Sequence, residues 1–146
     1  MRKLLLAFLV LMNLNNAFAQ DAAANLTQKN ASIHKIVFQL STEDTLAHKA
    51  LMKQLNNITT VAPDTKIEVV CHGPGLNMLI SSKTTVLLKI RELVKKDIQF
   101  VACEFSMKER NVDKTAIVKE SGFVKAGIIE IVEKQEAGWG YIKSGF

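Results

Sequence analysis

The chain has 146 residues and a formal net charge of +5, and hydrophobic residues make up 48% of it. This length suits one domain with a single core. The positive charge comes from lysines spread along the chain, not gathered with aromatic residues in one stretch. The sequence therefore does not predict a nucleic-acid interface.

The first 19 residues have the order of a secretory signal peptide. Arg2 and Lys3 precede an unbroken apolar stretch at residues 4–12, and Ala17-Phe18-Ala19 supplies a small-x-small cleavage site. The apolar stretch is too short to span a membrane, which needs ~20 residues. We predict cleavage after Ala19 and a periplasmic or secreted mature protein without a membrane anchor. A buried N-terminal helix is the alternative.

The rest of the chain divides into a lead-in and one domain. Residues 20–32 lack apolar periodicity, which predicts a flexible lead-in before a domain at 33–146. Apolar, β-branched runs predict strands at 33–40, 66–71, 98–103 and 123–126. Helical spacing predicts a helix that is capped by Ser41 or Thr42 and continues to about residue 58, and further helices at 84–96, 114–119 and 127–141. This alternation predicts an α/β fold with a mostly parallel sheet covered on both faces.

Reactive side chains follow two of these strands. Cys71 and His72 end the strand at 66–71, and Cys103 ends the strand at 98–103. Parallel strands end at the same edge of a sheet, so the three side chains are expected on one rim. A thiolate is a nucleophile, which makes Cys103 the candidate catalytic residue. A buried structural cysteine is the alternative.

The pKa of Cys103 depends on opposing neighbours. Lys108, Arg110 and a following helix N-terminus would lower this pKa, whereas Glu104 and the apolar Phe105 would raise it. The sequence leaves the sign of the balance open.

Several roles remain open for the other rim residues. Cys71 could be a second thiol or could form a disulfide with Cys103 if their strands are neighbours. His72 could act as a base, or it could hold the Gly-Pro-Gly turn that follows it. Gly73 and Gly75 could present amides to an anion, although a tight turn explains them equally well. Cys71, His72 and Cys103 form too weak a ligand set to predict a metal site, and we predict no cofactor.

Three segments resemble the DsrE/DsrF-like sulfur-relay family. IEVVCHGPGLNMLI at residues 67–80 is similar to that family's strand, His-Gly-x-Gly loop and apolar tail. FVACEFSMKERNV at 100–112 is similar to its cysteine loop, and VEKQEAGWGYIK at 132–143 to its C-terminal segment. The resemblance covers roughly residues 33–143.

The resemblance implies a three-layer α/β/α sandwich that assembles into homo-oligomers, commonly trimers or hexamers. It also implies that Cys103 carries sulfur as a persulfide between a sulfur donor and an acceptor protein. Two positions depart from the family pattern, because Phe105-Ser106 replaces the expected Asn-Thr and Cys71 replaces the more usual alanine.

Two functions of different class follow. The first is a periplasmic sulfur carrier or sulfurtransferase-like protein that uses Cys103. The second is a non-catalytic oligomeric binding protein that uses the same rim for a small ligand, a metal or a protein.

Overall fold

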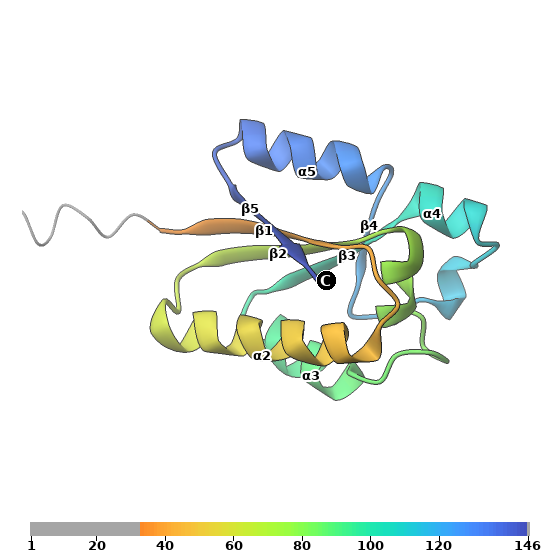
Figure 1. The fold of residues 1–146 in the computed structure, drawn as a ribbon, viewed down its shortest axis with the longest axis horizontal. Coiled ribbons are helices and arrows are strands. Elements are labelled where there is room, and N and C mark those ends of the chain that lie inside the picture. Colours follow the sequence, from red (N-terminus) through yellow and green to blue (C-terminus); the bar gives the residue numbers. More distant parts are fainter. Residues whose placement is uncertain (1–32, 146) are drawn as a thin grey trace, which may run out of the picture. The chain divides into compact units, whose positions relative to one another are not determined.

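The computed structural model describes residues 33–145, and its centre is a wholly parallel sheet. The five strands lie in the order β4-β3-β2-β1-β5 (Figure 1). They are β1 (Lys35–Leu40), β2 (Lys66–Cys71), β3 (Gln99–Cys103), β4 (Gly122–Val124) and β5 (Gly140–Ser144). The predicted signal peptide and lead-in lie outside the described residues.

Helices cover both faces of the sheet. α2 (Thr45–Val61) and α3 (Leu87–Val94) lie on one face, and α5 (Gly127–Glu136) lies on the other (Figure 1). α4 (Glu104–Glu109) follows β3 directly, and two 3₁₀ helices span Gly73–Met78 and Lys114–Ala116. This arrangement confirms the predicted three-layer α/β/α fold. Within residues 33–145, no helix has the length and apolar character needed to cross a membrane.

The two faces of the sheet bury unequal apolar clusters. Successive strand residues point to opposite faces, so Phe38 packs under α2 and α3 while Val37 packs under α5. The cluster under α2 and α3 is large and includes Leu51, Ile90 and Phe100. The buried cluster under α5 contains four residues: Val37, Val70, Val101 and Ile131. α5 therefore rests on much less apolar contact than the helices opposite.

A buried ion pair supplements this thin cluster. Lys134 Nζ of α5 lies 2.6 Å from Glu68 Oε2 of β2, and Glu68 is only 3% exposed. The Lys134 ammonium also lies 4.5 Å from the centroid of the Trp139 ring. Burial raises the pKa of Glu68, because desolvation of the carboxylate outweighs the attraction of Lys134. The pair ties the C-terminal half of α5 to the centre of the sheet.

The C-terminal segment corrects one prediction. The helix expected over residues 127–141 ends at Glu136, and a fifth strand follows it. The Gly138 amide donates to Gln135 O and the Trp139 amide donates to Lys134 O, which together form a Schellman motif. That motif ends the helix, and β5 pairs with the open edge of β1.

Other differences concern the ends of elements. α2 is capped by Asp44, whose side chain accepts a hydrogen bond from the Leu46 amide at 2.8 Å, so neither Ser41 nor Thr42 is the cap. The connection after Cys103 is helical, since α4 begins at the next residue. The helix predicted at 114–119 is a single 3₁₀ turn.

We predict that Lys134→Met destabilises the domain by ~3 kcal/mol at neutral pH, because it leaves the Glu68 carboxylate buried without its cation. The folded-state pKa of Glu68 is already raised and would rise further. The loss should therefore be absent below the unfolded pKa of glutamate and should grow as pH rises. Urea unfolding at several pH values measures this.

The matched variant is Glu68→Gln combined with Lys134→Met, which should recover most of the lost stability. A loss that does not depend on pH, or that persists in the double variant, would contradict the assignment.

Candidate functional site

Cys103 lies where three elements meet. It is the last residue of β3, it occupies the N-cap position of α4, and the N-terminus of α5 lies against it. Because Cys103 and Val101 are two residues apart, both point to the α5 face of the sheet. The side chain is therefore covered by the start of α5.

Backbone amides from two helix starts converge on the sulfur. The Gly127 amide donates to Cys103 Sγ at 3.2 Å, and the Ser106 amide donates to it at 3.5 Å. A β-carbon on Gly127 would lie 3.1 Å from His72 Cβ and 3.3 Å from Cys103 Cβ. Glycine at this position lets α5 approach closely enough for its first amide to reach the sulfur.

These donors decide the sign of the pKa shift. Burial raises the pKa of Cys103, but hydrogen bonds from the Ser106 side chain and from the amides of Ser106, Gly127 and Phe105 lower it more. The net effect is a pKa below that of an ordinary thiol. Amides at helix N-termini favour a thiolate in this way.

Ser106 links Cys103 to the loop after β2. The Gly73 amide donates to Ser106 Oγ at 2.8 Å, so the hydroxyl proton is free to point at the sulfur. Ser106 is buried and holds its place in the first turn of α4. The sequence did not point to a role for Ser106. It showed only that Phe105-Ser106 departs from the Asn-Thr expected in the family.

The neighbours expected to set the pKa of Cys103 act differently from the prediction. Phe105 is 53% exposed, and its backbone amide is among the groups that lower the pKa of the thiol. Glu104 pairs with Lys114. Lys108 and Arg110 are not among the main causes that lower the pKa of Cys103; the Ser106 hydroxyl and the amides at the helix starts are.

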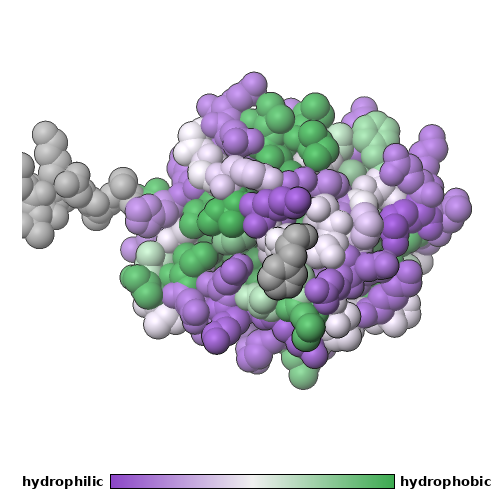
Figure 2. Space-filling model, viewed as in Figure 1, coloured by the Kyte–Doolittle hydropathy of each residue, from purple (hydrophilic) through white to green (hydrophobic). Residues whose placement is uncertain are grey.

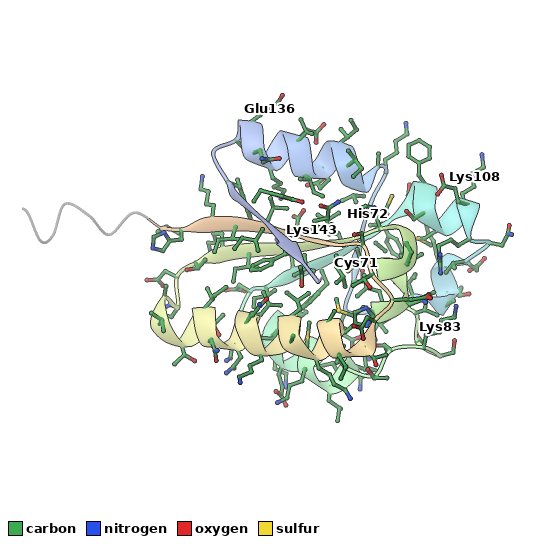
Figure 3. The ribbon with its side chains drawn as sticks, viewed as in Figure 1. Cys71, His72, Lys83, Lys108, Glu136 and Lys143 are labelled. Carbon is green, nitrogen blue, oxygen red and sulfur yellow. The ribbon has the colours of Figure 1, made fainter. Side chains whose placement is uncertain are left out.

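His72 and Cys103 both lie next to Gly127, and the His72 ring is hydrogen-bonded to the side chain of Gln39. His72 Nε2 lies 2.7 Å from Gln39 Nε2, and the Tyr141 hydroxyl donates to Gln39 Oε1. His72 also holds the Gly-Pro-Gly turn through a backbone hydrogen bond, as one of its two expected roles required, because its carbonyl accepts the Gly75 amide at 3.0 Å. Burial lowers the pKa of His72, which favours the neutral ring. Figure 3 labels His72 between the sheet and the end of α5 at which that helix begins.

Cys71 belongs to the opposite face. It is fully buried in the cluster under α2 and α3, and burial raises the pKa of its thiol. In the register, Cys71 pairs with Ala102, so Cys103 is one residue further on and points the other way. Both cysteines are free. The strands are neighbours, as the disulfide hypothesis required, but the alternation of side chains separates the two thiols.

The rim glycines are structural in different ways. The Gly73 amide is used by Ser106, and the Gly75 amide donates to His72 O. A β-carbon on Gly75 would lie 2.1 Å from Leu40 O, so this position must lie tight against the end of β1. Both amides therefore already donate hydrogen bonds within the protein, and neither is available to bind an anion. No group of three or more metal-ligating side chains occurs within residues 33–145, and Cys71, His72 and Cys103 do not converge.

The sulfur itself is almost covered. Cys103 is only 4% exposed, whereas two apolar residues close to it along the chain or next to Gly127, Phe105 and Ile128, are open to solvent. Figure 2 shows further apolar surface over the outer side of α5, where Ile129 and Val132 are exposed. The site is a polarised thiol beneath an exposed apolar surface.

We predict that Ser106→Ala raises the pKa of Cys103, because a hydrogen bond that favours the thiolate is lost. The rate of iodoacetamide alkylation at Cys103, followed by peptide mass against pH, measures this pKa. Ser121→Ala is the matched control, since its hydroxyl bonds to the Phe100 and Gly122 carbonyls instead. An unchanged profile in Ser106→Ala would contradict the role given to the hydroxyl.

Two solved structures share this fold. The protein of unknown function MTH1491 from Methanobacterium thermoautotrophicum aligns with a TM-score of 0.72 at 24% identity, over 75% of this chain and 98% of that one. The conserved protein of unknown function BT1422 from Bacteroides thetaiotaomicron aligns with a TM-score of 0.62 at 17% identity, over 75% of this chain and 93% of that one. At these identities the likeness concerns the fold alone.

The family is shown by the sequence match. No curated protein matches the chain. The family model described as DsrE/DsrF-like matches residues 23–144, which is most of the chain and includes every element of the sheet. The match confirms the resemblance found in the three sequence segments, and the chain belongs to the DsrE/DsrF-like family.

Proposed function

We propose that this protein is a sulfur carrier, similar to a sulfurtransferase, in which Cys103 holds a persulfide. The most direct support comes from the surroundings of the Cys103 sulfur. It accepts hydrogen bonds from backbone amides at the starts of α4 and α5, and the pKa of the thiol is lowered. A thiolate is the form of cysteine that attacks sulfur. Membership of the DsrE/DsrF-like family agrees with this chemistry.

The transfer step needs no oxidant or cofactor. The Cys103 thiolate attacks the outer sulfur of a donor persulfide, R–S–SH, and forms a new S–S bond to Cys103. The S–S bond of the donor breaks, and its inner sulfur leaves as the thiolate R–S⁻. Cys103 then carries S–SH, and the reverse reaction with an acceptor thiolate returns it to the free form.

The proposed setting is extracytoplasmic and oligomeric. The ordered charge, apolar stretch and cleavage site at residues 1–19 support export to the periplasm or beyond, with no membrane anchor after cleavage. The exposed apolar residues of α5 support a homo-oligomer, trimeric or hexameric as the family resemblance implies. A sulfur donor and an acceptor protein would be the other partners.

One observation favours the alternative of a non-catalytic binding protein. Cys103 is only 4% exposed, and a sulfur that attacks a donor must become accessible. In the carrier proposal, the start of α5 moves away from Cys103 during transfer. In the alternative, Cys103 is a structural N-cap of α4 and the exposed apolar rim binds a small ligand, a metal or a protein.

We predict that incubation of the mature protein with glutathione persulfide adds the mass of one sulfur atom to Cys103, because its thiolate attacks the sulfane sulfur. Intact mass and peptide mapping locate the adduct. The matched pair is Cys103→Ser, which should carry no adduct, and Cys71→Ala, which should carry it as the wild type does. Absence of the adduct from wild type, with an unchanged oligomeric state in Cys103→Ser, would favour the binding protein.

A further inference from the structure

Three side chains on adjacent strands form a hydrogen-bonded row that ends beside Cys103. Tyr141 of β5 donates its hydroxyl to Gln39 Oε1 of β1, and Gln39 Nε2 lies 2.7 Å from His72 Nε2, just after β2. All three lie on the α5 face of the sheet. The packing of the core does not require this row, since Gln39 and Tyr141 belong to neither buried apolar cluster.

The row determines where the imidazole proton lies. Tyr141 donates to the carbonyl oxygen of Gln39, so the amide group that faces His72 is the NH₂ donor. His72 Nε2 must then accept, and a neutral ring with a free Nε2 lone pair carries its proton on Nδ1. Burial lowers the pKa of His72 and so favours the same neutral form of the ring.

A neutral ring changes what His72 can do for the sulfur. The thiolate is already stabilised by the amides of Ser106 and Gly127, so it needs no imidazolium. A persulfide adds a second sulfur about 2.05 Å beyond Sγ, outside those two amides. The transfer leaves this outer sulfur as S–SH; once its proton has passed to water, the outer sulfur carries the negative charge and needs a donor of its own.

We propose that Tyr141 and Gln39 are positioning residues that hold His72 neutral with its proton on Nδ1, and that this N–H donates to the outer sulfur of the Cys103 persulfide. The inference rests on the proposed sulfur carriage. Its ground is the closeness of His72 and Cys103, whose β-carbons both lie within 3.3 Å of the point that a β-carbon on Gly127 would occupy. His72 acts here as a donor and not as a base.

The position of the proton can be tested without any sulfur chemistry. Long-range ¹H–¹⁵N NMR of the histidine rings reports the tautomer, and the His72 signals are assigned by their loss in His72→Asn. Wild type should show the Nδ1–H tautomer. Gln39→Glu presents a carboxylate that cannot donate, so Nε2 should become protonated. Gln54→Glu on the exposed side of α2 is the matched control and should change nothing. An Nε2–H tautomer in wild type would overturn the proposal.

The role of His72 as a donor is tested with two His72 variants. Two rates are measured in each, persulfide formation at Cys103 and alkylation of Cys103. Asparagine places an N–H near the position of Nδ1, whereas alanine has no donor. His72→Ala should slow persulfide formation from glutathione persulfide by roughly tenfold or more, as expected for the loss of a hydrogen bond to a charged group. His72→Asn should recover most of that rate. Alkylation of Cys103 should keep its pH profile in both variants, because the amides set the pKa of the thiol.

These readouts separate the two proposals. If wild type forms no persulfide, the proposed carrier function fails and the role of His72 as a donor fails with it, while the tautomer result still stands. If persulfide forms equally fast in wild type and His72→Ala, sulfur carriage stands and the donor role is wrong. A shifted alkylation profile in His72→Ala would instead mean that His72 acts on the thiolate itself, which also overturns the proposal.

Discussion

The wholly parallel sheet is the constraint on which the site depends. All its strands end at the same edge, so the helices that follow β3 and β4 begin there. The first amides of each helix have no hydrogen-bond partner within the helix. Cys103 ends β3 on the α5 face and receives two of those amides, from Ser106 and Gly127. A thiol placed one residue earlier would point to the other face and would meet apolar side chains instead. Cys71 points to that other face, where burial raises the pKa of its thiol, whereas the pKa of Cys103 is lowered.

The unequal faces of the sheet bear on access to the sulfur. α2 and α3 cover a large apolar cluster, whereas α5 rests on a small one and on the pair formed by Lys134 and Glu68. The start of α5 covers Cys103, and the ion pair lies two turns away toward its other end. Because α5 has fewer buried apolar contacts, its local opening costs less free energy than opening of α2 or α3. The same helix presents Ile128, Ile129 and Val132 to solvent, so a protein docked on it would act directly on the cover of the thiol.

The chemistry around Cys103 is that of an anion held by neutral donors. The charged side chains nearest to it in the sequence have partners of their own, since Glu104 pairs with Lys114 and Arg110 lies 4.0 Å from Glu43. Burial lowers the pKa of His72, and the side chain of Gln39 lies within hydrogen-bond distance of its ring. A thiolate held in this way does not depend on an imidazolium partner. Its separation from Cys71 also prevents an internal disulfide, which matters for a protein proposed to work in an oxidising compartment.

The amino-acid sequence by itself determined the α/β class, four of the five strands and the position of Cys103 at a strand end, because these follow from local periodicity and from the residues at strand ends. It also carried the family resemblance. It did not predict β5, since the helical pattern of residues 127–136 runs without a break into Gly138 and Gly140, and only the open edge of β1 makes a strand there. Tertiary structure alone decided which face each cysteine occupies, that Ser106 rather than Lys108 acts on the thiol, and that Gln39 and Tyr141 reach His72. These contacts join residues 33 and 102 positions apart, and the packing of a parallel sheet, not local sequence, brings them together.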